Sequence, residues 1–179
     1  YTEATPVQEQ CIPAVMDGRD VIGQSQTGTG KTAAFGLPLL EKLEVLEKRL
    51  PQVLIMTPTR ELTLQVTAEM RKFAKYKEGI RVVSIYGGDP ITTQIRDLKG
   101  GADIIVGTPG RIQDHINRRT LKFSSLKALV LDEADEMLKM GFKEEIEEII
   151  KSLPTERQTL LFSATMPKPI LDIVNNYQT

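Results

Sequence analysis

The sequence has little cysteine and histidine, no tryptophan and almost no net charge. Cys11 is the single cysteine among 179 residues, which excludes an internal disulfide, offers no thiolate cluster for zinc and suits a reducing compartment. His115 is the single histidine, and we expect it on the surface or at a helix cap rather than as a ligand or catalyst. The formal net charge is −1, so no domain-wide basic field attracts nucleic acid, and any such contact must be local.

Long apolar runs are missing as well. No segment is long enough to span a bilayer and no secretory segment opens the chain, so we expect a cytoplasmic protein without a membrane partner. A hydrophobic content of 40% over 179 residues suits one globular domain with a full core. We find no linker, repeat or low-complexity tract, and residues 1–179 are therefore expected to form a single unit.

Short β-branched runs alternate with longer amphipathic segments along the chain. This pattern predicts an α/β fold, in which a doubly wound, mostly parallel sheet carries helices on both faces. Apolar residues at helical spacing predict helices over Glu61–Lys77 and Lys143–Lys151, and the leucines of Leu39–Leu50 predict a third. The predicted strands are Val21–Gly23, Val53–Met56, Val82–Tyr86, Ile104–Gly107, Ala128–Leu131 and Thr159–Phe162.

Polar clusters gather just after these strands. The carboxyl ends of parallel strands meet at one edge, and open α/β sheets bind their ligands at that edge. We therefore predict one binding edge that is built from many short loops. The clusters occupy residues 24–32, 57–60, 87–88, 108–111, 132–135 and 163–165.

The first cluster has the composition of a phosphate-binding loop. It leads into a helix, whose N-terminus offers unpaired N–H groups and a positive dipole end to an anion. Gly28 and Gly30 allow the backbone to approach phosphate closely. Lys31 reaches the outer phosphates, and Thr32 offers a hydroxyl to Mg²⁺. The predicted cofactor-binding residues here are Ser25, Gln26, Thr27, Gly28, Thr29, Gly30, Lys31 and Thr32.

A second cluster, which is acidic, completes a nucleotide triphosphate site. Asp132 follows the apolar strand at 128–131, which would deliver it to the metal as a Walker-B carboxylate. Glu133 is then a candidate base for the attacking water. Because the two clusters occur in the expected order and context, they predict nucleotide triphosphate binding.

Two loops repeat the pattern Thr-Pro-x-Arg. In 57–60 and 108–111 a threonine can cap a helix, a proline suits the first helical position, and an arginine lies in the first turn. A cation there opposes the helix dipole, and an external phosphate is the common reason for such a placement. The pair predicts contacts to successive phosphates of a polynucleotide. The alternative is that both loops only cap helices and that Arg60 and Arg111 form internal salt bridges.

Two weaker signals belong to the same edge. Gln8 carries the donor and acceptor pair that matches adenine N6 and N7, which would select ATP over GTP. The hydroxyls of Ser163 and Thr165 follow the last strand, where they can bond to the carboxylates of residues 132–135 and respond to the nucleotide.

Together these motifs resemble the DEAD-box family of ATP-dependent RNA helicases, specifically the first of its two RecA-like domains. The resemblance covers essentially the whole chain. Thr63 stands where the family usually has alanine, which we expect to have no effect, and Ser25 replaces the glycine of a strict Walker A loop. The matching motifs, in chain order, are Thr5, Pro6 and Gln8; Ser25–Thr32; Pro58–Leu62; Gly87-Gly88; Thr108–Arg111; Asp132–Asp135; and Ser163–Thr165.

The resemblance implies a RecA-like P-loop NTPase domain over residues 1–179, with ATP and Mg²⁺ as cofactors. RNA and a second RecA-like domain, which this chain lacks, are the implied partners. The catalytic residues would be Glu133, Lys31 and Asp132; Thr5 and Gln8 would join the phosphate loop in binding the cofactor; Thr32 and Asp132 would hold Mg²⁺, partly through water; and Asp135, Ser163 and Thr165 would couple the sites. The RNA-binding residues would be Pro58, Thr59, Arg60, Gly87, Gly88, Thr108, Pro109, Gly110 and Arg111.

The implied activity is ATP hydrolysis coupled to the separation of short RNA duplexes, once the second domain supplies its arginine fingers. The isolated chain is expected to be nearly inactive. Two alternatives remain open. An RNA clamp or scaffold locked by ATP would use the same motifs, whereas another P-loop ATPase, such as a DNA recombinase or a protein-remodelling motor, would not explain the paired Thr-Pro-x-Arg loops or Gln8.

Overall fold

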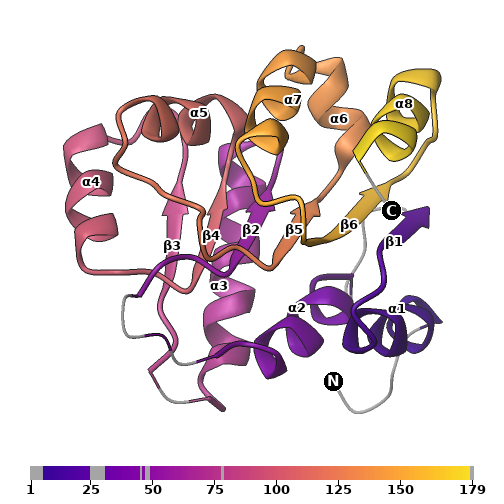
Figure 1. Cartoon of the computed structure of the whole chain (residues 1–179), viewed down its shortest axis with the longest axis horizontal. Coiled ribbons are helices and arrows are strands. Elements are labelled where there is room, and N and C mark those ends of the chain that lie inside the picture. Colours follow the sequence, from indigo (N-terminus) through magenta and orange to yellow (C-terminus); the bar gives the residue numbers. More distant parts are fainter. Residues whose placement is uncertain (1–5, 25–30, 45, 47–48, 78, 178–179) are drawn as a thin grey trace.

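The structure, a computed structural model, describes residues 6–24, 31–44, 46, 49–77 and 79–177. Within these residues a single six-stranded sheet runs through the molecule, with the strand order β1-β6-β5-β2-β4-β3, and every neighbouring pair is parallel (Figure 1). The strands are β1 (Val21–Gln24), β2 (Val53–Met56), β3 (Val82–Ile85), β4 (Ile104–Gly107), β5 (Ala128–Leu131) and β6 (Gln158–Ser163).

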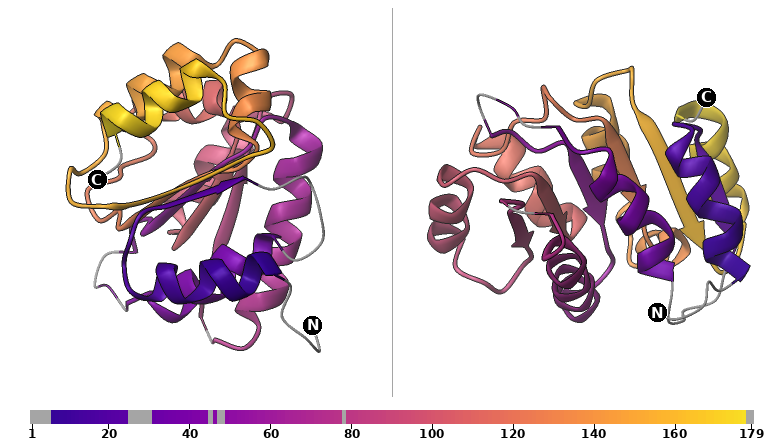
Figure 2. Two further views of the ribbon diagram at one scale, coloured as in Figure 1. Left: turned by 90° about the vertical axis from the view of Figure 1, so that its right-hand side faces the viewer. Right: turned by 90° about the horizontal axis from the view of Figure 1, so that it is seen from below.

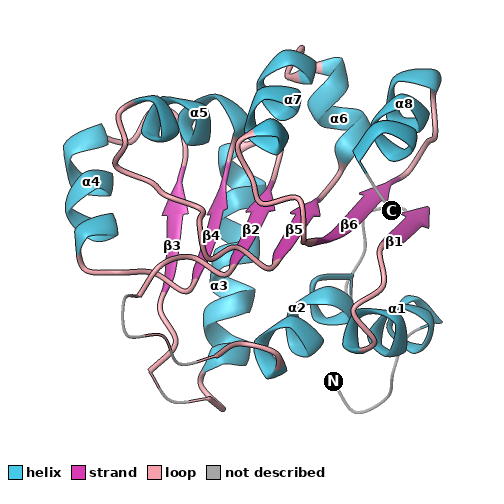
Figure 3. Cartoon of the chain, in the orientation of Figure 1, coloured by secondary structure: helices cyan, strands magenta, loops and turns pink. Residues whose placement is uncertain are grey.

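Helices connect the strands. Figure 2 shows this in two further views, each turned by 90° from that of Figure 1. Each helix follows or precedes a strand, so the chain alternates between strand and helix along most of its length (Figure 3). The helices are α1 (Pro6–Met16), α2 (Lys31–Glu41), α3 (Arg60–Ala74), α4 (Ile91–Lys99), α5 (Pro109–Asn117), α6 (Ala134–Lys139), α7 (Lys143–Lys151) and α8 (Lys168–Tyr177).

Two hydrophobic cores form because the side chains of each strand alternate between the two faces of the sheet. Val53 and Ile55 of β2 pack with α1, α2 and α3 on one face. Leu54 and Met56 of the same strand pack on the other face, where α5 to α8 supply the facing residues and Leu98 of α4 packs at the margin. Helices therefore cover both faces, as the sequence predicts (Figures 1 and 2).

The predicted strands are confirmed. Three of them, β2, β4 and β5, match residue for residue; β1 and β3 differ by one residue at one end, and β6 is one residue longer at each end. The helix predicted at Lys143–Lys151 is confirmed with its bounds, and the one predicted at Glu61–Lys77 begins at Arg60 and ends at Ala74.

The prediction of a helix over Leu39–Leu50 is wrong, because α2 ends at Glu41. The ammonium group of Lys77, beyond the end of α3, takes the place of further helical hydrogen bonds. Its Nζ donates to the carbonyl oxygens of Leu40 at 2.8 Å and Leu43 at 3.1 Å. This cation satisfies carbonyl groups that a helix end leaves unpaired. The helix therefore ends where leucine spacing alone predicts that it continues.

No helix in the described part of the chain is long and apolar enough to cross a membrane. Since all neighbouring strands are parallel, their carboxyl ends lie at one edge of the sheet. The predicted functional loops follow these ends, and the fold therefore brings them to a common edge.

Candidate functional site

The strand order sorts the predicted motifs into two neighbouring groups. The strands that precede the nucleotide motifs, β1, β6 and β5, are neighbours in the sheet. The strands that precede the Thr-Pro-x-Arg and paired-glycine motifs, β2, β4 and β3, are neighbours as well. The groups meet between β5 and β2, where Asp132 N donates to Met56 O at 2.9 Å.

The nucleotide group is built around a buried ion pair. Lys31 is the first residue of α2 and is 7% exposed, and Asp132, just after β5, is fully buried. Their Nζ and Oδ1 atoms are 2.6 Å apart. Burial raises the pKa of Asp132, while the charge of Lys31 opposes that rise. The structure thus brings together the two side chains that the sequence places more than a hundred residues apart.

Asp132 also has unused capacity to bind a cation. Besides the ion pair with Lys31, the neighbouring N–H of Glu133 helps to lower the pKa of Asp132, but no other side chain in the described part of the chain bonds to its carboxylate oxygens. A buried carboxylate oxygen without a partner is costly unless something else contacts it. Carboxylate and hydroxyl oxygens are ligands that Mg²⁺ prefers, and the buried Thr32 follows Lys31 directly. The carboxylate of Asp132 and the hydroxyl of Thr32 are therefore suitable ligands for Mg²⁺.

Glu133 has an unusual backbone conformation for a residue with a side chain. Its φ and ψ are 53° and 53°, in the left-handed region, and it precedes the first residue of α6. Such a conformation costs free energy outside glycine and is concentrated at functional sites. Burial, together with the charges of Asp132, Glu136 and Asp135, raises the pKa of Glu133 against the opposing effect of Lys31. A carboxyl whose pKa is shifted toward neutrality suits a general base.

Asp135 connects the acidic cluster to the loop after β6. Its Oδ2 accepts from the hydroxyl of Thr165 at 3.0 Å and from the Thr165 N–H at 3.2 Å. Its own N–H donates to Ser163 Oγ at 3.2 Å. Burial alone would raise the pKa of Asp135, but the hydrogen bonds from Thr165 and Ser163 outweigh it and lower the pKa. The predicted proximity of these three residues is therefore present, through Asp135 rather than through Asp132.

The two Thr-Pro-x-Arg loops differ in their local structure. At α5, Thr108 is the N-cap and Pro109 the first helical residue, although the Thr108 side chain makes no capping bond. At α3 the predicted arrangement is wrong, because Thr59 is the N-cap, accepts from Leu62 N at 3.1 Å, and leaves Pro58 outside the helix. The reason lies in Thr57, which is buried and whose N–H donates to Gly107 O at 2.9 Å. Residue 57 thus ends the sheet instead of starting the helix.

Thr63, which stands in the position of the family's usual alanine, has defined partners. Its hydroxyl lies 2.6 Å from the hydroxyl of Thr57 and donates to Thr59 O at 2.8 Å. Thr63 is fully buried. The substitution therefore adds hydrogen bonds between the end of β2 and the first turn of α3.

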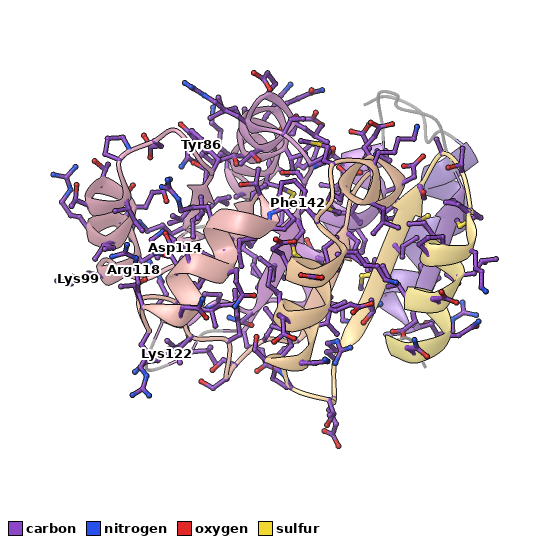
Figure 4. The ribbon with its side chains drawn as sticks, turned by 90° about the horizontal axis from the view of Figure 1, so that it is seen from above. Tyr86, Lys99, Asp114, Arg118, Lys122 and Phe142 are labelled. Carbon is purple, nitrogen blue, oxygen red and sulfur yellow. The ribbon has the colours of Figure 1, made fainter. Side chains whose placement is uncertain are left out.

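Arg60 is exposed at the start of α3, and its guanidinium carbon lies 5.4 Å from the centroid of the Tyr86 ring. This geometry is a cation–π contact, which limits where the guanidinium can point. Figure 4, the view from above, marks Tyr86 near the carboxyl edge, Asp114 on α5 and its ion-pair partner Arg118 just after that helix. In the part of the chain that the structure describes, neither Arg60 nor Arg111 belongs to an ion pair.

Arg111 is held by neutral acceptors. Its Nη1 donates to the carbonyl oxygen of Asp89 at 2.8 Å and to Gln94 Oε1 at 3.1 Å. Asp89 follows the predicted glycine pair, in which Gly88 has a φ of +93°, a conformation that favours glycine. Two predicted loops are thus connected through Arg111.

The expectation that His115 lies on the surface is wrong, since its side chain is fully buried. Nδ1 lies 2.7 Å from Thr120 Oγ1, and Nε2 lies 2.9 Å from Gln94 Oε1. Burial, followed by the charge of Arg111, lowers the pKa of His115. Sequence reasoning missed Tyr86, Gln94 and this role of His115, because their partners come from other elements and no local pattern marks them.

Some predicted residues cannot be placed. Thr5 and Ser25–Gly30 lie outside the described residues, and Gln8 lies in α1 without a described side chain. Their assigned roles stay predictions. Cys11 is described and buried, and burial raises the pKa of its thiol.

A RecA-like sheet that carries a buried Lys–Asp pair and a DEAD sequence at its carboxyl edge defines a class of helicase domains. The chain matches the DEAD/DEAH box helicase family over residues 5–173 and belongs to that family. Two crystal structures share its fold. One is of a DEAD box protein from the hyperthermophile Methanococcus jannaschii, with a TM-score of 0.91 and 44% identity over 98% of this chain and 47% of that chain. The other is of a hypothetical ATP-dependent RNA helicase from Sulfolobus tokodaii, with a TM-score of 0.89 and 38% identity over 100% of this chain and 51% of that chain.

Curated relatives are similar in sequence but longer. The ATP-dependent RNA helicase CshA of Listeria monocytogenes is 59% identical over 170 residues, which are 95% of this chain and 32% of the relative. The ATP-dependent RNA helicase DeaD of Haemophilus influenzae is 53% identical over 177 residues, which are 99% of this chain and 29% of the relative. The chain thus spans about a third of the length of the relatives that it matches.

Proposed function

We propose that this chain is the ATP-binding, N-terminal RecA-like domain of an ATP-dependent RNA helicase. In the whole protein, a second RecA-like domain would complete the site, and ATP hydrolysis would be coupled to the separation of short RNA duplexes. The observation that carries the proposal is the buried pair of Lys31 and Asp132, in which no side chain other than Lys31 bonds to the carboxylate oxygens of Asp132 in the described part of the chain. The names of the similar helicases support it.

The chemistry divides among residues of one edge. Residues 25–31 would hold the phosphates at the N-terminus of α2, and Thr32 and Asp132 would hold Mg²⁺, partly through water. The metal ion supplies positive charge that neutralises the developing charge on the phosphate oxygens. Lys31 lies close enough to Asp132 to contribute its own charge at the same place.

Glu133 would orient and deprotonate the attacking water. Its left-handed backbone distinguishes it from Asp132 and Asp135, and its raised pKa distinguishes it from Asp135. Asp135, through its bonds to Thr165, would relay the state of the nucleotide site to the loop after β6.

RNA would bind along the loops after β2, β4 and β3. Arg60 is exposed and forms no ion pair with a carboxylate in the described residues. Arg111 uses only Nη1 in its hydrogen bonds there, so the N–H groups on Nε and Nη2 can donate to a phosphate. With Thr59, Thr108 and the Gly87-Gly88 backbone, these donors would take phosphates without reading sequence. A cytoplasmic location belongs to this proposal, and the single cysteine supports it.

Calorimetric titration of ATP·Mg²⁺ and GTP·Mg²⁺ tests the proposal. We expect binding of ATP with discrimination against GTP, loss of the discrimination in Gln8→Ala, and loss of ATP binding in Lys31→Ala. A melting curve accompanies Lys31→Ala, because this variant removes the cation from a buried carboxylate. Unchanged ATP affinity in a folded Lys31→Ala variant would contradict the nucleotide site, and equal wild-type affinities for ATP and GTP would contradict the role of Gln8.

A further inference from the structure

Beneath the proposed RNA loops lies a polar side chain to which the mechanism assigns no role. Gln94 in α4 is fully buried. It is surrounded by groups from three other segments: the turn after β3, the first turn of α5 and the last part of α5. A buried glutamine amide is costly unless its donors and acceptor are satisfied, so its partners show what it holds in place.

The neighbours of Gln94 fix the orientation of its amide. Its Nε2 donates to the carbonyl oxygen of Tyr86 at 3.0 Å and to Asp89 Oδ2 at 3.1 Å. Both partners are acceptors, so the amide nitrogen must face them. Its Oε1 then faces Arg111 Nη1 at 3.1 Å and His115 Nε2 at 2.9 Å, which must both be donors.

This orientation also fixes the tautomer of His115. Nε2 carries the proton that it donates to Gln94, so Nδ1 of the neutral ring must accept. The Thr120 hydroxyl, whose single proton can also reach His115 O at 3.1 Å, is the donor to Nδ1 at 2.7 Å. The lowered pKa of His115 favours this neutral form. The ring thus holds the same amide oxygen that accepts from Arg111.

Gln94 therefore joins two loops that follow neighbouring strands. On one side it binds the turn from Tyr86 to Asp89, which contains Gly87-Gly88; on the other it occupies one nitrogen of the Arg111 guanidinium. That nitrogen also donates to Asp89 O. No other residue in the described part of the chain takes the N–H groups on Nε and Nη2 of Arg111, and these form a planar fork that matches a phosphate.

We infer that Gln94 is a positioning residue, which holds the Arg111 guanidinium and the Gly87-Gly88 turn at the separation that successive RNA phosphates require. It touches no RNA itself. This inference rests on the proposed function, because it assumes that Arg111 contacts a phosphate. It adds that the contact depends on a buried amide between the two loops.

The test uses the intact protein that carries this chain. RNA-stimulated ATP hydrolysis is measured against the concentration of a single-stranded RNA, and the affinity for the same labelled RNA is measured over a range of salt concentrations. We expect Gln94→Leu to raise the RNA concentration for half-maximal stimulation about tenfold, in line with a lost bond to a charged group, while kcat at saturating RNA is retained. The salt slope should fall by about 0.7, the value for one lost phosphate contact on a single strand.

Gln52 offers a matched control. It is buried like Gln94, at 1% exposure, and its amide also bonds to backbone, with Nε2 to Glu44 O at 2.8 Å and Oε1 to Glu44 N at 3.0 Å. It precedes β2, at the opposite edge of the sheet. Gln52→Leu should lower the melting temperature as Gln94→Leu does and leave the RNA dependence and the salt slope unchanged.

Combination with Arg111→Ala separates the possible failures. Gln94→Leu should weaken RNA binding less in the Arg111→Ala background than on its own and should leave the salt slope unchanged there, because the guanidinium is already gone and only the Gly87-Gly88 turn remains to be displaced. If Arg111→Ala alone leaves affinity and salt slope unchanged, the proposed RNA contact fails, and this inference fails with it. If Arg111→Ala weakens binding but a folded Gln94→Leu variant does not, only the positioning role is overturned.

A second substitution decides the matter if Gln94→Leu does not fold. Gln94→Glu keeps an oxygen that accepts from Arg111 and His115 but removes the donors to Tyr86 O and Asp89. It should bind RNA more weakly, because the Gly87-Gly88 turn loses its anchor and because the new carboxylate pairs with the Arg111 guanidinium. Wild-type RNA affinity in this variant would overturn the inference.

Discussion

At the scale of single residues, Glu133 combines a strained backbone with a shifted acid strength. Its left-handed φ of 53° directs the chain from β5 into α6, and its pKa is raised chiefly by burial and by neighbouring carboxylates. A base must be deprotonated to act, so activity should fall as the pH drops through this raised pKa, above the ordinary glutamate value of about 4.3.

Glu133→Gln tests that role in the intact protein. The amide keeps the size of the side chain and cannot accept the water proton, so we expect ATP affinity near the wild-type value and kcat reduced by about 10² or more. Steady-state hydrolysis from pH 5 to 8, with nucleotide affinity measured in parallel, provides the comparison. Turnover of Glu133→Gln at the wild-type rate would refute the assignment.

His115 should make the fold sensitive to acid. Its pKa is lowered in the folded protein, so below the unfolded value of about 6.5 the unfolded chain binds a proton that the folded chain resists. The stability that neutral His115 contributes is present above that pH and is lost as the pH falls through the folded pKa. The maximum slope for one proton is about 1.4 kcal/mol per pH unit.

Urea unfolding of the chain at pH 7.5, 6.5 and 5.5 measures this dependence. The free energy of unfolding should decline more steeply with acid in the wild type than in His115→Gln, which lacks the titrating ring. Carboxylates contribute to both proteins and cancel in the difference. Parallel slopes would show that His115 titrates alike in the folded and unfolded states.

At the scale of elements, the approach of β4 to β3 depends on a position without a side chain. A Cβ on Gly107 would collide with the backbone oxygen of Ile85 and would lie 3.1 Å from Ile112. The Ile85 oxygen cannot turn away cheaply, because it accepts from Thr108 N at 3.0 Å. Gly107→Ala should therefore destabilise the chain by about 1–3 kcal/mol, which lowers the melting temperature by about 3–10 °C for a domain of this size.

Gly110 supplies the comparison for this substitution. It lies in the first turn of α5, and an added Cβ would meet only Phe142, at an ordinary 3.9 Å. Gly110→Ala should leave the melting temperature unchanged or slightly higher, because alanine favours the helix. Equal melting curves for the two variants would show that the β3–β4 contact adapts to the added methyl group.

The elements also show why much of the fold is predictable from sequence. Buried parallel strands are short and β-branched, so runs such as Val53–Met56 are recognisable locally, and the carboxyl ends of these strands share one edge as predicted. The helix predicted over Leu39–Leu50 failed because Lys77, distant in sequence, supplies its end. The prediction of a surface position for His115 is wrong for the same kind of reason, since Gln94 and Thr120 provide hydrogen-bond partners for its two ring nitrogens in the interior. Local pattern predicts elements, whereas partners from elsewhere decide ends and buried polar groups.

At the scale of the whole molecule, the chain is expected to be incomplete as a motor. It spans 32% of the Listeria monocytogenes helicase that it matches. If arginine fingers come from a second domain, their absence should reduce the rate by about 10³–10⁵. Arg60 and Arg111 belong to the proposed RNA loops and do not replace them.

We therefore expect residues 1–179 alone to bind ATP and to show almost no RNA-stimulated hydrolysis or unwinding, even at high concentration. Hydrolysis assays with and without RNA, on the chain and on the intact protein, make the comparison. Addition of the second domain in trans should restore little activity, because the linker no longer supplies its effective concentration. Vigorous RNA-stimulated turnover by the chain alone would contradict the two-domain proposal.

The strand order has a consequence for how such a molecule can be altered. Loops assigned to nucleotide follow β1, β6 and β5, and loops assigned to RNA follow β2, β4 and β3. The two sets share one border, where Leu131 of β5 is in register with Met56 of β2. If the register between β5 and β2 is kept, recombination or protein design could exchange the loops assigned to RNA as one block and leave the phosphate site unchanged. On this proposal, RNA affinity and ATP binding could be altered separately within one sheet.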